Sequence, residues 1–130
     1  MWATLKQQVT TALQTELPDV VVWLEYDAAL PDADTVIVRR VGTGNSRPLF
    51  APQSGVENFF IECIATDRDT TVADLKLQSL ENNVIAVLSK LARMPPINGI
   101  VINSTACDDD QFRPKVCSQF SVSISWRLFV

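Results

Sequence analysis

The last part of the chain, residues 116–130, alternates between apolar and polar side chains. From Phe120 onwards every second residue is apolar, and the positions between them include Ser121, Ser123 and Ser125. Because side chains on a β-strand point alternately to opposite faces, this pattern predicts a strand with one apolar and one hydroxyl face. A strand of this length would span roughly 45 Å, which is longer than most strands. A small domain can cover only part of it, so we expect the remainder to serve another chain.

Two segments show the three- and four-residue spacing of apolar positions that is typical of amphipathic helices. The first covers residues 2–17 and ends before Pro18. The second begins with a capping-box pattern at Thr71, in which a hydroxyl is followed three residues later by a carboxylate, and it continues to Met94 before two prolines. Its length of about 24 residues corresponds to roughly 36 Å.

Runs of β-branched and aromatic residues, separated by turn residues, predict the other strands. We expect the first two to pair as a hairpin, and the third, which is apolar on both faces, to be a central strand covered on both sides. A short strand after an Asn98-Gly99 turn precedes the final one. The predicted strands cover residues 20–24, 35–41, 56–66, 100–102 and 116–130. The order α-β-β-β-α-β-β predicts a single α+β domain over residues 1–130, with a mainly antiparallel β-sheet packed against two α-helices.

The segment between the second and third strands, residues 42–55, is rich in glycine and proline and has no periodicity. It is predicted to be a long loop or irregular hairpin, and such loops in compact domains are often functional. Arg47, Leu49 and Phe50 lie in its middle. Two interpretations of the apolar pair stay open: it docks on a partner, or it folds back onto the core.

Composition indicates one globular domain. The 130 residues are 47% apolar and 20% charged, which is a profile without a disorder signature. The net charge of −4 argues against broad binding of nucleic acid or of anionic membranes, both of which require a basic face. The chain has no run of about 18 apolar residues that could form a transmembrane helix, and its first residues lack the apolar core of a signal peptide. We therefore expect the protein to be made and kept in the cytoplasm.

The residues needed for common catalytic and metal sites are scarce. No histidine is present, which excludes Ser-His-Asp and Cys-His arrangements. Cys63, Cys107 and Cys117 form no CxxC pair, so a zinc site is not expected. Cys107 and Cys117 could flank a turn and meet. However, the odd cysteine count and the cytoplasmic setting favour buried, small apolar residues over a disulfide.

Acidic residues occur in pairs and in one triplet. The Asp32/Asp34 and Asp67/Asp69 pairs lie among turn residues and are interpreted as turn and helix-start chemistry. The triplet Asp108-Asp109-Asp110 could bind Ca²⁺ or Mg²⁺. Neighbouring residues in a run cannot all point at one ion, however, so a solvated acidic loop is favoured. We expect no metal, no cofactor and no enzymatic activity.

The close basic pairs are Arg39-Arg40 and Arg113/Lys115. On a strand, Arg39 and Arg40 point to opposite faces and make no patch by themselves. One interpretation gives them solubility and weak surface salt bridges. The other pairs them with an acidic loop such as 108–110 on a neighbouring subunit, because interfaces are enriched in arginine.

The element order, together with an acidic loop before a long alternating strand, resembles the tail terminator proteins of tailed bacteriophages, also called minor tail or tail-completion proteins. The most specific local match is Asp108-Asp109-Asp110 followed by residues 120–126, Phe-Ser-Val-Ser-Ile-Ser-Trp. The resemblance covers nearly the whole chain in length and element order. It implies a non-catalytic virion protein, assembled in the host cytoplasm, that forms a hexameric ring on the head-proximal end of the tail tube.

Such a ring would stop tube polymerisation, present a surface to the head-completion protein and, in a contractile tail, face the sheath protein. DNA would pass through its lumen without specific binding, and Asp108, Asp109 and Asp110 would form an acidic lumen or interface loop. The residues expected at subunit or partner interfaces are Arg39, Arg40, Arg47, Leu49, Phe50, Arg113, Ser121, Ser123 and Ser125. Three alternatives stay open: a head-completion or connector protein, a small enzyme that uses Asp or Cys, and a cellular protein-interaction module.

Overall fold

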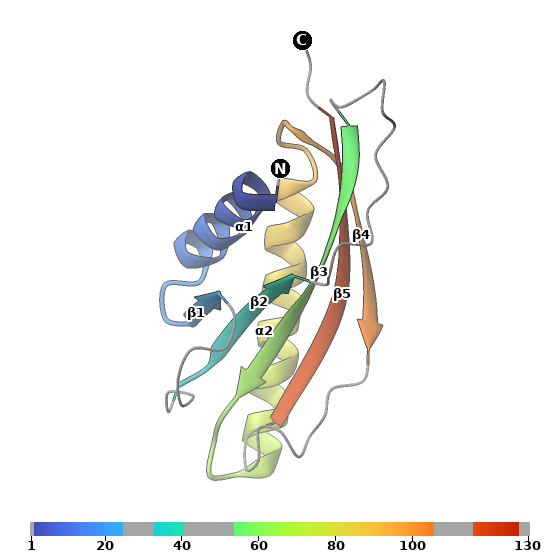
Figure 1. Cartoon of the computed structure of the whole chain (residues 1–130). Coiled ribbons are helices and arrows are strands. Elements are labelled where there is room, and N and C mark those ends of the chain that lie inside the picture. Colours follow the sequence, from blue (N-terminus) through green and yellow to red (C-terminus); the bar gives the residue numbers. More distant parts are fainter. Residues whose placement is uncertain (1, 25–32, 41–53, 106–115, 128–130) are drawn as a thin grey trace.

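The computed structural model describes residues 2–24, 33–40, 54–105 and 116–127. The described residues form two helices and five strands in the order α-β-β-β-α-β-β (Figure 1), which confirms the predicted α+β class. The elements are α1 (Trp2–Glu16), β1 (Val21–Leu24), β2 (Thr35–Arg40), β3 (Ser54–Ala65), α2 (Thr70–Leu91), β4 (Ile97–Thr105) and β5 (Val116–Arg127).

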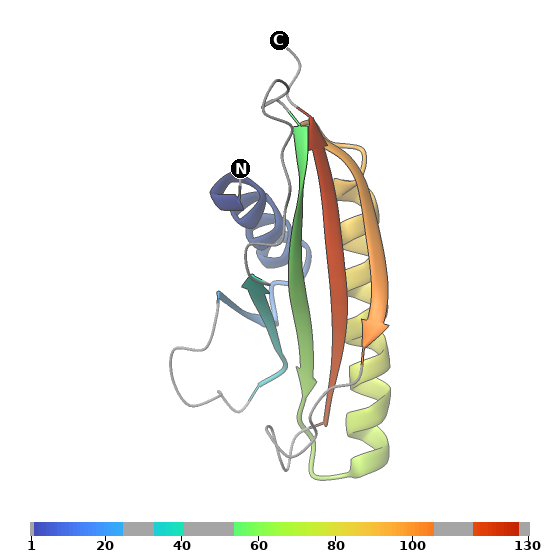
Figure 2. The same cartoon turned by 45° about the vertical axis from the view of Figure 1, so that its right-hand side comes forward.

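The strands form one sheet with the order β1-β2-β3-β5-β4. The long strands β3 and β5 pair along twelve residues each and form the centre of the sheet, as expected for β3 (Figure 2). Residues 61–65 of β3 are buried on both faces. The short strand β1 and the nine-residue strand β4 are the two edges.

The predicted hairpin between the first two strands is wrong. Val21 pairs with Thr35 and Leu24 pairs with Val38, so β1 and β2 run parallel, while the other strand pairs are antiparallel. A hairpin joins its strands by a turn of about two to five residues. The connection between Leu24 and Thr35 is longer than such a turn. A longer connection lets the chain return to the end of the sheet where β1 begins, so that β2 can run in the same direction.

Helix α2 begins two residues earlier than its capping-box pattern, with Thr71 as the N-cap, suggests. Asp69 is the N-cap, and its side chain accepts a hydrogen bond of 2.9 Å from the backbone N–H of Thr71. Asp and Thr are both good N-cap residues, and the structure uses the first one along the chain. The helix has 22 residues and ends at Leu91, so Met94 lies outside it. The Pro95-Pro96 peptide bond that follows is cis.

The predicted turn at Asn98-Gly99 is also wrong, because both residues lie within β4. The pairing of β4 with β5 shifts register between Ile97 and Gly99. The extra residue is therefore absorbed as a β-bulge, which bends a strand without ending it.

The hydrophobic core lies between the two helices and one face of the sheet. Alternate residues of β5 point into it, which confirms the apolar face predicted for this strand. The core side chains of β5 are Phe120, Val122, Ile124 and Trp126. The helices contribute Leu5, Val9 and Leu13 from α1 and Leu80, Val84, Val87, Leu88 and Leu91 from α2. Because α1 and α2 cover only this face, we call it the helix face and the opposite one the outer face.

Candidate functional site

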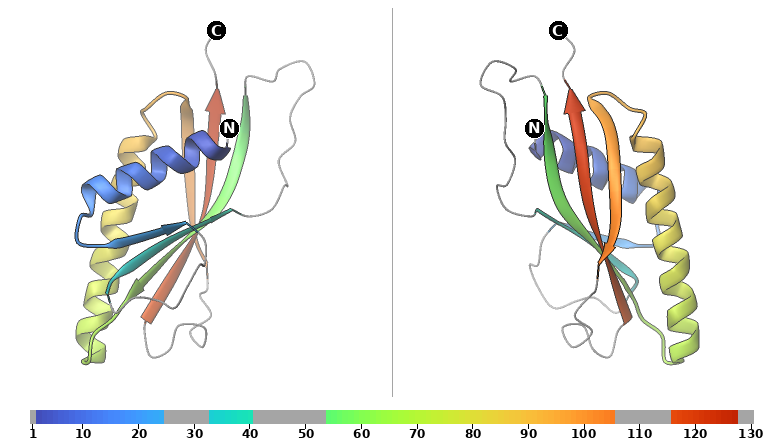
Figure 3. Two further views of the ribbon diagram at one scale, coloured as in Figure 1. Left: turned by 60° about the vertical axis from the view of Figure 1, so that its left-hand side comes forward. Right: turned by 90° about the vertical axis from the view of Figure 1, so that its right-hand side faces the viewer.

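The outer face brings together several residues that the sequence predicted for an interface. In an antiparallel pair, directly opposite residues point to the same side of the sheet. Arg39 of β2 lies opposite Phe60 of β3, and Phe60 lies opposite Ser121 of β5. Ser123 and Ser125 follow on the same side of β5. Arg39 and the three serines therefore share one face, which points away from the helices (Figure 3).

Three strands contribute nine neighbouring positions to this face, and we call them the outer patch. The rows, read from β3 through β5 to β4, are Val56-Ser125-Gly99, Asn58-Ser123-Val101 and Phe60-Ser121-Asn103. None of the nine side chains carries a charge. Val101 is 59% exposed and Val56 is 38% exposed. The outer patch is thus an uncharged surface with two exposed apolar side chains among hydroxyls and amides.

A hydrogen bond orders the centre of the outer patch. The Ser123 hydroxyl donates to Oδ1 of Asn58 across the β3–β5 pair at 2.6 Å. This contact holds the two polar side chains against the sheet and against each other. The serine face was predicted, but the contribution of β3 and β4 was not, because it depends on the register between distant strands.

An ion pair borders the outer patch on the β2 side. The Arg39 guanidinium donates to the carboxylate of Glu62, and the Gln119 amide donates to the same carboxylate oxygen at 3.1 Å. Glu62 is 1% exposed and Arg39 is 31% exposed. A buried carboxylate is stable only when it is paired and hydrogen-bonded. Arg39 therefore has a partner within its own chain.

Glu62 was not among the predicted site residues. A carboxylate inside an apolar strand, between Phe60 and Ile64 on the same face, was the sequence feature that could have indicated it. A second buried carboxylate, Glu57, lies on the helix face of β3.

The remaining predicted site residues cannot be placed on this surface. Arg40 ends β2, and its side chain is not described. Loop residues Arg47, Leu49 and Phe50, together with Arg113 and the triplet at 108–110, lie outside the described residues. Their roles stay predictions, as does the pairing of Arg39 with an acidic loop of a neighbour.

Two of the cysteines differ in state. Cys63 is a buried free thiol, as expected. The pKa of Cys63 is raised to about 12, mainly by burial and further by the carboxylate of Glu81, while the Ser118 side chain opposes the change. Cys63 is therefore protonated at neutral pH, and a thiol is a poor nucleophile compared with a thiolate.

The expectation that Cys117 is reduced is wrong, because this residue is disulfide-bonded. It lies on the outer face near the start of β5, opposite Ile64. The expectation rested on the redox state of the cytoplasm, which does not determine which side chains the fold brings together. Cys107 lies outside the described residues.

A charged hollow of about 720 Å³ lies where α2 begins and β3 ends. Lys76 donates to Asp67 at 3.0 Å and to the backbone carbonyl of Thr66 at 3.3 Å. The backbone N–H of Asp69 and then Lys76 lower the pKa of Asp67, whose hydrogen bond in turn raises the pKa of Lys76. These carboxylates serve the turn and the start of the helix, as predicted for Asp67 and Asp69. Within the described ranges no group of acidic or cysteine side chains is suited to hold a metal ion.

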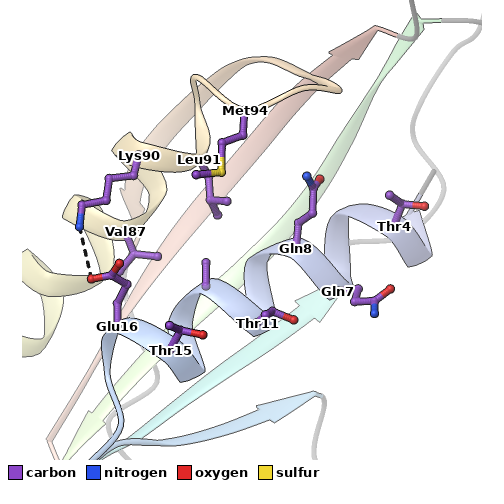
Figure 4. A pocket seen from close by; sticks show the side chains of 11 residues that line it. Thr4, Gln7, Gln8, Thr11, Thr15, Glu16, Val87, Lys90, Leu91 and Met94 are labelled. Carbon is purple, nitrogen blue, oxygen red and sulfur yellow. Dashed lines mark hydrogen bonds and ion pairs between the residues drawn. The ribbon is translucent and has the colours of Figure 1, made fainter.

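A groove of about 520 Å³ separates α1 from the C-terminal part of α2 (Figure 4). An ion pair of 3.3 Å between Lys90 and Glu16 closes one end. At the other end the Gln8 amide donates to the backbone carbonyl of Pro95 at 3.3 Å. Apart from this ion pair, the lining is apolar on the α2 side and mostly hydroxyl or amide on the α1 side.

Comparison with known proteins assigns no family, since no protein-family model matches the chain and no curated protein matches its sequence. None of the described helices is long and apolar enough to cross a membrane.

Proposed function

We propose that this chain is a structural virion protein, without enzymatic activity, that caps the head-proximal end of a phage tail tube as a ring of identical subunits. In that position it ends tube polymerisation and forms the surface that joins the tail to the head. The resemblance of the chain to tail terminator proteins suggests six subunits. It also suggests tube, head-completion and sheath proteins as partners.

The observation that carries this proposal is the outer patch. A ring subunit needs surfaces beyond its own core that another protein can meet, and interfaces are depleted of charge at their centre. The outer patch extends over three strands, is uncharged and includes Val56 and Val101 as exposed apolar side chains. The alternating strand β5 supplies both this surface and the core of the domain, so the same sequence pattern supports the fold and the contact.

Chemistry elsewhere in the described chain agrees with a structural role. The Cys63 thiol is buried and protonated. The carboxylates Asp67 and Asp69 are engaged in turn and helix-cap hydrogen bonds. Glu62 is paired with Arg39. In each case the reactive group is already used to stabilise the fold.

The proposal is tested by light scattering after size-exclusion chromatography, with the protein alone and with a purified tail tube protein. We expect multimers or binding to tube ends, and shorter tubes when the protein is added during polymerisation. A protein that stays monomeric and leaves tube length unchanged contradicts the proposal. Immunogold labelling of separated heads and tails distinguishes the terminator from a connector, since a label on the vertex of tailless heads alone favours the connector.

A matched pair of variants tests the role of the outer patch. Ser123→Arg places a charge at its centre and should abolish tube binding. Ser79→Arg places the same side chain on an exposed position of α2, away from the sheet, and should bind like the unchanged protein. Equal binding by both variants would remove the outer patch from the proposal.

A further inference from the structure

The edge strand β4 lacks the features that normally keep an exposed strand from pairing with another chain. Natural edge strands are short, or carry lysine, proline or a bulge that interrupts pairing. The nine residues of β4, Ile97–Thr105, include no charged residue and no proline. The register irregularity lies at its start, between Ile97 and Gly99, so residues 100–105 continue as a regular strand. The opposite edge, β1, has only four residues.

In the described part of the chain, β4 has one strand partner, β5, on its inner side. Figure 3 shows β4 at the margin of the sheet, with α2 over the helix face only. Val101 on the outer face is 59% exposed, the highest value among the large apolar strand residues whose exposure is described. Ile100 and Ile102 on the helix face pack only partly against the core. On both of its faces, β4 therefore presents apolar side chains at the margin of the sheet. A neighbouring strand would cover them.

We propose that β4 pairs antiparallel with β4 of a second copy of this chain, with Val101 on the two-fold axis. A one-residue change of register would turn every side chain to the wrong face, so only registers that keep the faces matched are allowed. With Val101 opposite its own copy, Ile100 lies opposite Ile102 of the partner copy and Gly99 lies opposite Asn103. On the helix face, isoleucine then packs against isoleucine. On the outer face, the small Gly99 leaves space for the Asn103 amide of the partner copy.

The second copy is favoured over an unrelated partner because the strand is symmetric about its centre. The sequence from Gly99 to Asn103 reads Gly-Ile-Val-Ile-Asn, so the three central residues are the same in either direction. Like charges placed opposite each other would destabilise such a pair, and here there are none. The pairing would join two five-stranded sheets into one and place two outer patches side by side.

Cysteine cross-linking tests the contact directly. Val101→Cys should form a disulfide-linked dimer under mild oxidation, because the two side chains would face each other across the axis. Val56→Cys is the matched control: it is exposed on the same outer face, but β3 is separated from the edge by β5 and β4. Dimer at position 101 with little at position 56 supports the proposal. Equal cross-linking, or none at 101, overturns it.

A second measurement does not depend on added cysteines. Val101→Lys would place two ammonium groups on the axis, and we expect the mass measured by light scattering to fall by half, from two chains to one. Val72→Lys, on an exposed position of α2, should keep the dimer mass, and circular dichroism should show that both variants fold. An unchanged protein that is monomeric at tens of micromolar overturns the pairing.

This inference goes beyond the proposed function and can fail separately from it, because a two-fold contact joins two chains and does not by itself close a ring. A six-chain ring that binds tubes but gives no cross-link at position 101 contradicts the β4 contact and leaves the terminator proposal intact. A β4-linked dimer that does not affect tubes supports the contact and contradicts the terminator.

Discussion

The two faces of β5 have the same backbone and the same neighbours but opposite environments. On the helix face, Ile124 is fully buried beneath the helices. On the outer face, Ser123 and Ser125 are half-buried and lie among uncharged side chains of β3 and β4. The difference indicates that the helix face of β5 contributes most to stability, whereas its outer face stays partly open to solvent.

The largest effect is expected from the helix face. Ile124→Ala removes buried methyl groups and leaves a cavity, which costs about 2–5 kcal/mol of unfolding free energy. The neighbouring change Ser125→Ala on the outer face should alter it by less than about 0.5 kcal/mol. Urea denaturation followed by circular dichroism measures both. Similar losses for the two variants would mean that the outer face is also part of the core.

The second prediction concerns the Arg39–Glu62 ion pair at the border of the outer patch. Here, unlike at Ser125, we expect outer-face side chains to contribute to stability. Arg39→Met removes the Arg39 guanidinium from the buried Glu62 carboxylate, which keeps its hydrogen bond from the Gln119 amide. Removing one partner of a buried pair costs about 3–5 kcal/mol, and because Arg39 is 31% exposed we expect a smaller loss of about 2 kcal/mol.

The control for this prediction is a double-mutant cycle. Glu62→Gln combined with Arg39→Met removes the charge together with its partner, so the double variant should lose less than the sum of the two single losses. Additive losses in urea denaturation would show that the two side chains do not interact in solution.

The third prediction compares two glycines on opposite faces. A Cβ atom on Gly55 would lie 2.8 Å from Cζ2 of Trp126, whereas one on Gly99 would meet nothing within 4 Å. Gly55→Ala therefore forces the indole to move and should cost about 1–3 kcal/mol. Gly99→Ala should change stability by less than about 0.5 kcal/mol. Thermal unfolding of both variants checks this, and an equal shift would contradict the close contact between Gly55 and the indole.

Features that depend on local pattern could be predicted from the sequence. The alternation in residues 120–126 assigned each side chain of β5 to its face, because the period of a strand is local. The apolar spacing of residues 2–17 likewise located α1 to within one residue of its end. Helix starts were less certain, since Asp69 and Thr71 can both cap a helix and the local sequence does not rank them.

Features that depend on long-range pairing could not be predicted. The parallel pairing of β1 with β2 and the position of β5 between β3 and β4 are set by contacts between distant segments. The serine side of the candidate site was therefore predicted, whereas Asn58 and Val101 joined it only through strand register. Glu62 was missed for the same reason, because its partner Arg39 is 23 positions away.

The smallest effect is expected within the outer patch itself. Ser123→Ala removes the hydroxyl that donates to Asn58 at 2.6 Å, and a hydrogen bond of this kind contributes about 0.5–1.5 kcal/mol. Because Ser123 is only half-buried, water can compensate for part of the lost hydrogen bond. We therefore expect the free energy of unfolding to fall by about 0.5 kcal/mol. Ser121→Ala, one row away, should lose less still. If the Ser123 variant keeps its stability in urea denaturation but loses binding to tail tubes, its hydroxyl acts in contact with a partner. If it loses as much stability as Ile124→Ala does, the outer face is part of the core and not a separate contact surface.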